Sequence, residues 1–273
     1  MKVLSAKYSE DVKGYLSHYH NAHELLYILS GKIAVNICGE EREAGAGSLL
    51  IFSRFEEHSV RVLTPEYRRY TLLISPDITR GDDDYLLSSV LINRTGRFDH
   101  IISFDIEQNN IGSLMKEMAE EFLNQAPMCE KVLDSMLTRL LVCLYRIKPE
   151  LFLTDENRNT EIVRELQAKF EKDYFENFSL ANLAVGYHIS ESHLSHIFKN
   201  VTGYAPIEYL MSCRLSAAKN LLSTTDMSIK EIIDLCGFSD ESNFSRTFKS
   251  KTGMTPSEFR KQNLRRSIDK PKK

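Results

Sequence analysis

Two segments in the last third of the chain present the same kinds of polar and basic side chain at the same spacing. On one helical face these are Ser192, Ser195, His196 and Lys199 in the first segment, and Ser242, Ser245, Arg246 and Lys249 in the second. Serine and arginine can form hydrogen bonds with base edges in a major groove, and lysine can reach phosphate. The pattern predicts contact with double-stranded DNA. The alternative is that each polar face is simply the solvated side of its helix.

The two segments are copies of one motif. Residues 191–209 and 241–259 align over 19 positions, of which nine are identical: Glu, Ser, Ser, Phe, Lys, Thr, Gly, Pro and Glu. Two copies are too few for a solenoid, which needs at least three repeats to bury its core. The repeat therefore indicates a pair of similar small helical modules.

The residues at the ends of each copy predict where its helix begins and ends. Ser190 and Asp240 stand where an N-cap side chain accepts a hydrogen bond from the first turn. Gly203 and Gly253 stand where a helix ends in the left-handed conformation. Pro206 then suits the first position of the next helix, because no backbone N–H is needed there.

Neighbouring elements complete the expected arrangement. A short amphipathic helix precedes each copy, at 180–185 and at 229–235, and a tight turn follows it, which is helix-turn-helix order. Residues 207–222 are predicted to form one helix between the modules, about 24 Å long at 1.5 Å per residue. Such a spacer could set two recognition helices in successive major grooves, about 34 Å apart.

The residues at these positions resemble the AraC/XylS family of bacterial transcription regulators. The resemblance rests on Leu183, Ala184, Ser190 to Leu194, Phe198, Lys199, Thr202, Gly203, Pro206, Tyr209, Leu210, Arg214, Leu215, Ala218, Leu221, Leu222, Gly237, Phe238, Phe248, Lys249, Gly253, Pro256 and Arg260. By this resemblance the first recognition helix contacts bases through Ser192, Ser195 and His196. The second does so through Ser242, Asn243, Ser245 and Arg246. Because the first helix offers only serine and histidine, we expect the second to recognise sequence more sharply.

The first 74 residues have a different pattern of residue types. Short β-branched and aromatic runs alternate with glycine, asparagine or acidic turns, which is typical of a small barrel or sandwich. The runs are 23–31, 32–38, 47–52, 58–63 and 67–74.

Four side chains in this region resemble the two motifs of the cupins. His18, His20 and Glu24 fit the first motif and His58 fits the second, although residues 53–57 replace the usual Pro-x-Gly turn. In metal-binding cupins these positions hold the ion, and such ligands suit Fe, Mn, Zn or Ni. By the resemblance to regulators, we expect the four side chains to line an effector pocket or to bond within the barrel instead. We therefore predict no metal and no cofactor.

Two further amphipathic stretches, within 111–123 and 133–144, predict a helix hairpin with apolar stripes. Packing against the barrel is one role for it. Dimerisation is the other, as the resemblance implies. Residues 151–158 are predicted to be the linker to the helical modules.

Composition narrows the class of protein. The chain has no apolar run long enough to cross a bilayer and no signal-peptide pattern. Its five cysteines are scattered without a Cys-x-x-Cys motif, which favours reduced thiols in the cytoplasm. The formal net charge of −3 is uneven: residues 1–159 hold 18 basic and 24 acidic side chains, and residues 160–273 hold 17 and 14. The second part therefore suits phosphate better than the first.

Together these features predict an α+β multidomain fold, with an N-terminal cupin-like β-barrel, a helical connector and a C-terminal all-α domain with two helix-turn-helix motifs. We expect the barrel at residues 1–98 and the helical hairpin and linker at 99–159. The AraC-type DNA-binding domain is expected at 160–263 and a basic tail at 264–273.

The predicted function is a cytoplasmic, sequence-specific transcription regulator, an activator, that responds to a small-molecule effector such as a sugar. Expected partners are promoter DNA, the effector, RNA polymerase and a second copy of the chain, with no membrane. A metal-dependent cupin enzyme or metal sensor fused to helix-turn-helix modules is the alternative. A constitutive DNA-binding protein whose barrel only dimerises is a third option. No nucleophile motif or phosphate-cradling glycine loop is present, so we expect no catalytic residues.

Overall fold

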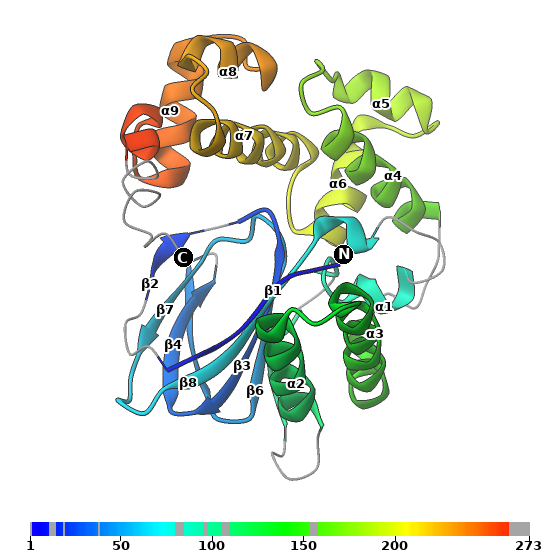
Figure 1. The fold of residues 1–273 in the computed structure, drawn as a ribbon. Coiled ribbons are helices and arrows are strands. Elements are labelled where there is room, and N and C mark those ends of the chain that lie inside the picture. Colours follow the sequence, from blue (N-terminus) through cyan, green and yellow to red (C-terminus); the bar gives the residue numbers. More distant parts are fainter. Residues whose placement is uncertain are drawn as a thin grey trace. The chain divides into compact units, whose positions relative to one another are not determined.

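The computed structural model describes residues 2–10, 15–18, 20–37, 39–79, 85–94, 98–104, 110–152 and 158–261, so the predicted basic tail lies outside it. The chain divides into two compact units, Met1–Glu156 and Asn157–Lys273. Strands predominate in the first unit and helices form the second (Figure 1). The predicted α+β multidomain fold class is confirmed.

Two antiparallel sheets form the barrel of the first unit. The five-stranded sheet contains, in spatial order, β1 (Val3–Ser9), β8 (Arg68–Ile74), β3 (His23–Ser30), β6 (Ser48–Phe52) and β9 (Ile101–Ser103). The four-stranded sheet contains β2 (Tyr15–His18), β7 (His58–Val62), β4 (Lys32–Ile37) and β5 (Glu40–Gly45). Strand β9 lies beyond residue 98, and the three-part division of this region stays a prediction.

Strand β3 is buried on both of its faces. Side chains of a strand alternate between the two faces of a sheet. Leu26 and Ile28 belong to the core between the two sheets, whereas Leu25 and Tyr27 belong to a second core on the outer face of the five-stranded sheet. This explains why the sequence from His23 to Ile28 is buried throughout rather than at every second residue.

Helices cover the outer face of the five-stranded sheet. Helix α2 (Ile111–Asn124) and helix α3 (Cys129–Ile147) pack against each other, and both contact β1 (Figure 1). At Gly112 a Cβ would lie 2.8 Å from Cε1 of Tyr27, so glycine allows α2 to approach the sheet this closely. The predicted helix hairpin is thus present and packs on the barrel. Its role in dimerisation stays a prediction.

Three short elements complete the first unit. They are the 3₁₀ helices η1 (Pro76–Thr79) and η2 (Pro149–Leu151) and the helix α1 (Tyr85–Ser89).

The second unit contains the two expected helix-turn-helix pairs. Helix α4 (Arg158–Lys172) precedes them; α5 (Leu180–Gly186) and α6 (Glu191–Thr202) form the first pair, and α8 (Ile229–Leu235) and α9 (Glu241–Thr252) form the second. The spacer between the pairs is α7 (Pro206–Thr224), which is slightly longer than predicted. Residues 256–261 are also helical.

The predicted helix ends are confirmed. Ser190 Oγ accepts a hydrogen bond from the backbone N–H of His193 at 3.2 Å, and Asp240 Oδ1 accepts one from Asn243 at 2.6 Å. Gly203 and Gly253 end α6 and α9 with φ of 80° and 74°. These local signals position both recognition helices.

The turns of the two helix-turn-helix pairs differ in whether they require glycine. The first turn places His188 at φ 57°, and the second places Gly237 at φ 73°. A Cβ at Gly237 would collide with the backbone of Phe175, so the second turn needs glycine for space as well as for conformation.

Candidate functional site

The predicted DNA-contacting side chains lie on α6 and α9, away from the buried face of each helix. Six of them are exposed and three are half-buried. The exposed ones are Ser192, His196, Lys199, Ser242, Arg246 and Lys249, and the half-buried ones are Ser195, Asn243 and Ser245. The structure therefore leaves these nine side chains at the surface of the unit, which contact with a partner requires.

Aromatic and aliphatic side chains fix the opposite faces. In α6 the buried set includes Leu194, Ile197 and Phe198, whereas in α9 it is reduced to Phe244 and Phe248. The apolar stripe of the second recognition helix is thus the thinner of the two. Phenylalanines around α9 compensate for it by edge-on or tilted contacts, with ring centroids 4.8–5.5 Å apart.

Two arginines of the family signature stabilise the unit itself. Arg214 donates hydrogen bonds to the carbonyl oxygens of Tyr174 and Glu176, at 2.8 and 2.7 Å. Arg260 donates one to the carbonyl oxygen of Met227. These contacts tie α7 and the last helical segment to the loops that precede the two helix-turn-helix pairs. The resemblance to the family thus includes structural positions as well as the positions predicted to contact DNA.

In the first unit, three of the four predicted pocket residues converge. Nε2 of His20 lies 2.8 Å from Oε2 of Glu24, and Nε2 of His58 lies 3.3 Å from the same oxygen. Glu24 and His58 are buried, and Phe52 stacks on the His58 ring with centroids 4.1 Å apart. For His18, the backbone pairs with His58 in the β2–β7 register, but its side chain lies outside the described part of the structure.

The other ring nitrogens of the two histidines determine what this cluster can hold. Nδ1 of His20 donates to the carbonyl oxygen of Ala22, and Nδ1 of His58 donates to that of Glu56, both at 2.9 Å. A neutral ring so oriented turns its Nε2 lone pair toward the carboxylate of Glu24. A proton on Nε2 or a cation between the groups removes that repulsion. The cluster can therefore bind a proton or a metal ion.

The protonation state of Glu24 follows from the same contacts. Burial of the carboxylate opposes its ionisation, but hydrogen bonds from His20 and His58 outweigh burial and lower the pKa of Glu24 to about 2. The neighbouring His23 is fully buried, and this burial, with the charges of Arg54 and Arg94, lowers its pKa well below the usual range. Glu24 is thus ionised and His23 neutral at pH 7.

Next to the cluster lies a second set of charged residues that the sequence did not indicate. The carboxylate of Glu56 accepts hydrogen bonds from Arg94 Nε and Nη2, from His100 Nε2 and from the backbone N–H of Ser53, at 2.7–2.9 Å. Burial opposes the ionisation of Glu56, but Arg94 and His100 hold its pKa well below the usual range. The only sequence signal was the replaced turn at 53–57, since its partners are far away in the chain.

Models of known protein families match parts of both units. A model of a helix-turn-helix domain matches residues 183–262, and a model of a cupin domain matches residues 10–74. The arabinose operon regulatory protein of Escherichia coli is 44% identical over 84 residues, which are 31% of this chain and 29% of that protein. The Msm operon regulatory protein of Streptococcus mutans is 31% identical over 134 residues, 49% of this chain and 48% of that protein. The chain thus spans less than half of either relative.

Solved structures extend the likeness to nearly the whole chain. ToxT from Vibrio cholerae, in its P21 crystal form, superimposes with a TM-score of 0.60 at 19% identity, covering 95% of this chain and 98% of ToxT. At this identity the likeness shows the fold. The two matched domains and this fold define a protein in which a cupin-like barrel is followed by a domain with two helix-turn-helix motifs. The predicted resemblance to AraC/XylS family regulators with a cupin-like N-terminal domain is confirmed.

No helix in the described part of the chain is long and apolar enough to span a membrane.

Proposed function

We propose that the chain is a sequence-specific DNA-binding transcription regulator, an activator, whose N-terminal unit binds a small-molecule effector. The observation that carries the proposal is the pair of capped recognition helices, each with short polar and basic side chains on its exposed face. Short side chains let a helix enter a major groove, and basic ones contact phosphate or guanine. Promoter DNA, RNA polymerase and a second copy of the chain are the proposed partners.

The relatives support this assignment by their names. The Escherichia coli and Streptococcus mutans proteins are named as operon regulatory proteins. Such a role needs no catalytic group, and we propose that the chain is not an enzyme. Its expected location is the cytoplasm, where promoter DNA is found.

The decisive experiment is selection of duplex DNA from a random library with the full-length chain, followed by footprinting and a salt titration. A regulator of this kind protects two neighbouring major grooves, and the logarithm of its affinity falls linearly with the logarithm of salt concentration. Failure to enrich any sequence, together with affinity that salt does not change, would refute DNA recognition.

An effector role for the N-terminal unit is supported by precedent and by chemistry. One solved ToxT structure carries an unsaturated fatty acid, whereas the Escherichia coli relative is named for an arabinose operon. A sugar therefore stays one prediction for the effector. An effector acts by binding two states of the protein with different affinity, which shifts their populations. We propose that binding in the first unit changes how the second unit engages DNA.

A metal sensor is the second candidate, favoured by the converging side chains of His20, Glu24 and His58. Their ligand atoms all lie within 4.8 Å of one another. Both histidines donate Nδ1–H to a backbone carbonyl, the usual arrangement of a metal-bound histidine. The donor set fits a transition metal, which would bind the two Nε2 atoms and the carboxylate, with His18 as a fourth ligand. Bound metal would supply a charge that fixes this end of the barrel.

A further inference from the structure

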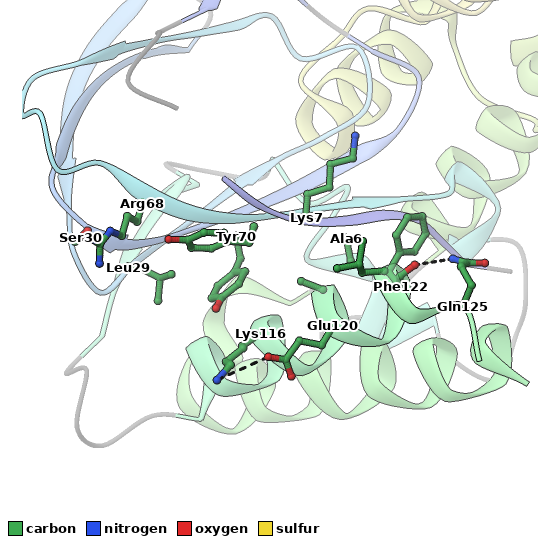
Figure 2. Close-up of a pocket in the computed structure, with 13 residues that line it drawn as sticks. Ala6, Lys7, Leu29, Ser30, Arg68, Tyr70, Lys116, Glu120, Phe122 and Gln125 are labelled. Carbon is green, nitrogen blue, oxygen red and sulfur yellow. Dashed lines mark hydrogen bonds and ion pairs between the residues drawn. The ribbon is translucent and has the colours of Figure 1, made fainter. Parts of the chain in front are cut away.

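A groove of about 960 Å³ lies between helix α2 and the outer face of the five-stranded sheet. Its floor is formed by β1, β8 and the end of β3, and its wall by one stripe of α2 with the spacing i, i+3, i+4 and i+7 (Figure 2). The wall residues are Lys116, Ala119, Glu120 and Leu123. The volume is within the range of small-molecule pockets, roughly 300–1,000 Å³. All lining residues belong to the first unit.

The barrel interior offers a contrast to this groove. Between the two sheets, Leu26, Ile28, Ile33, Val35 and Phe52 are completely buried against one another. These side chains form the packed core between the two sheets. The groove on the other side of the five-stranded sheet is hollow and opens at β1, the edge strand.

Apolar side chains line one end of the groove. Ala6 and Ala119 lie at its base, and Phe122 and Leu123 lie beside them, where Leu123 is 80% exposed. In Figure 2, Phe122 lies next to Ala6, on the side of the groove opposite Arg68. An exposed leucine over a hollow of small side chains can bury its surface only when something occupies the groove.

Cations and hydroxyl groups lie at the other end. Arg68 and Tyr70 face α2 from alternate positions of β8, and Tyr8 packs on Tyr70 with ring centroids 5.6 Å apart. Lys116 stands opposite on α2 (Figure 2). In the sequence, residues 1–159 have an excess of acidic side chains. A cationic end in this part of the chain is therefore a local feature of the groove.

Two carboxylates lie at this end of the groove: Glu10, which accepts a hydrogen bond from Tyr8, and Glu120. Glu120 pairs with Lys116 at 3.8 Å, and both side chains are 60% exposed. The charge of Glu120 also adds to the burial that raises the pKa of Tyr70. An exposed lysine–glutamate pair contributes only about 0.3–0.5 kcal/mol, so an incoming anion can displace the carboxylate at little cost. With Lys116 so released, the end of the groove offers two cations and the Tyr70 hydroxyl, whereas the Tyr8 hydroxyl donates a hydrogen bond to Glu10 at 3.1 Å.

We propose that this groove binds an amphipathic carboxylate, with its anionic group between Arg68 and Lys116 and its hydrocarbon part over Ala6, Ala119 and Leu123. Arginine binds carboxylate with two parallel hydrogen bonds, and the Tyr70 hydroxyl can donate a further one. The apolar end buries the hydrocarbon, at about 0.8 kcal/mol for each CH₂ group removed from water. The inference rests on the proposed function, because it names the chemical class of the effector.

The test uses a tryptophan placed in the groove. The chain contains no tryptophan, so Tyr8→Trp introduces a single indole at a position that is 46% exposed. Sodium decanoate is titrated below its micelle concentration, with 10-bromodecanoate as a contact quencher. We expect saturable quenching at one molecule per chain. Decan-1-ol should bind about 10-fold more weakly or worse, and decyltrimethylammonium should not compete.

Variants locate the ligand. Arg68→Gln combined with Lys116→Gln should weaken decanoate binding by about 10-fold or more, and Leu123→Glu should abolish it. Because these three side chains are exposed, the variants should fold, and far-UV circular dichroism checks this. Lys131→Gln, an exposed lysine of α3 outside the groove, is the control and should bind as the parent does.

Several results would overturn the site. Quenching that does not saturate, equal binding of the ammonium compound, or full affinity in the Arg68/Lys116 double variant would each do so. If instead Leu123→Glu converts a dimer to a monomer in light scattering and 10-bromodecanoate does not quench the indole of the Tyr8→Trp protein, this face is an interface between copies. If decanoate binds in the groove but does not change the DNA footprint, the groove is still a binding site, but its ligand is not an effector. If the chain binds decanoate but no DNA, the proposed DNA-binding function is refuted and the groove site is not.

Discussion

Arg94 holds the carboxylate of Glu56 through two parallel hydrogen bonds, Nε to Oε1 at 2.9 Å and Nη2 to Oε2 at 2.8 Å. Both side chains are 6% exposed. His100 completes the set at 2.8 Å from Oε1. The pair joins the turn that leads into His58 to the segment that follows α1. It thereby fixes the backbone carbonyl of Glu56, which orients the His58 ring.

Removing one partner of this pair should destabilise the first unit strongly. Glu56→Gln leaves the buried Arg94 guanidinium without its counter-charge, and breaking a buried pair in this way costs about 3–5 kcal/mol. We expect a loss of that size in the free energy of unfolding, measured by urea denaturation with circular dichroism. Arg61→Gln is the control, because Arg61 and its partner Glu41 are 62% and 57% exposed. That variant should change stability by less than about 1 kcal/mol, and equal effects of the two variants would show that the buried pair contributes nothing.

The same carboxylate predicts how the first unit responds to acid. The pKa of Glu56 is lower in the folded chain than its ordinary value of 4.5. Below pH 4.5, Glu56 therefore binds a proton in the unfolded chain but not in the folded chain. The free energy of unfolding falls as pH decreases. Above that pH the contribution is fully present. The slope of stability against pH between 4.5 and 3 should be smaller in Glu56→Gln than in the parent, measured by urea denaturation at each pH. Identical slopes would contradict the assignment.

The second unit was largely predictable because its signals are local. Ser190, Gly203, Asp240 and Gly253 act within one helical turn, so the residue type alone reveals a helix start or end. The repeat then shows that the two modules share one design. The spacer helix could be predicted in the same way, from its proline start and its apolar spacing.

The buried ion pair and the groove could not be predicted, since both arise from tertiary packing. Glu56 meets Arg94 and His100 across 38 and 44 residues, and no periodic spacing links them. The groove exists because α2 crosses β1 and β8 with small side chains, Ala6 and Ala119, at their contact. The cupin pattern did indicate that His20, Glu24 and His58 would meet. It could not show that both histidines turn Nδ1 toward backbone carbonyls.

Metal analysis separates the two candidate functions of the barrel. The 2.8 Å separation of His20 Nε2 and Glu24 Oε2 is a hydrogen-bond length, so we expect less than about a tenth of an equivalent of transition metal per chain. Elemental analysis of the full-length chain purified without chelator measures this, and EDTA should not change its melting temperature. One equivalent of metal that is lost in His20→Ala combined with His58→Ala, but retained in His196→Ala, would establish the metal sensor instead.

A half-buried lysine, Lys219, gives the second unit its own pH dependence. Burial lowers the pKa of Lys219 in α7 to about 8, against 10.5 for an exposed lysine. Below pH 8 the folded unit bears the cost of burying this charge. Between pH 8 and 10.5 the unfolded chain holds more protons than the folded chain, so stability rises with pH.

Replacing this lysine should therefore stabilise the unit at neutral pH. We expect Lys219→Met to raise the free energy of unfolding by up to about 3 kcal/mol at pH 7, from 1.36 kcal/mol per pKa unit, and the advantage should vanish by pH 10.5. Urea denaturation at pH 7, 8.5, 9.5 and 10.5 measures it. Lys230→Met, at an exposed position of α8, should show no such trend. A gain that is the same at every pH would mean that packing, rather than charge burial, is responsible.

The two recognition helices should differ in how they recognise DNA. Arg246 in α9 is exposed and can donate two hydrogen bonds to one guanine, a contact worth about 1–3 kcal/mol of discrimination. His196 occupies the matching position of α6, and its Nε2 already contacts the side chain of Asn200 at 3.0 Å. Arg246→Ala should therefore relax the sequence preference at one base pair by about 5- to 150-fold, and His196→Ala by much less.

The lysines one turn further along should behave differently from both. Lys199→Gln and Lys249→Gln should weaken binding to all sequences alike and lower the salt slope by about one each, because lysine there meets phosphate. Selection from a random duplex library with each variant, followed by salt titration of the selected site, measures both quantities. If His196→Ala relaxes specificity as much as Arg246→Ala does, the two helices recognise bases equally. The prediction that the first helix anchors the protein while the second recognises sequence would then be wrong. Both helices would still contact DNA.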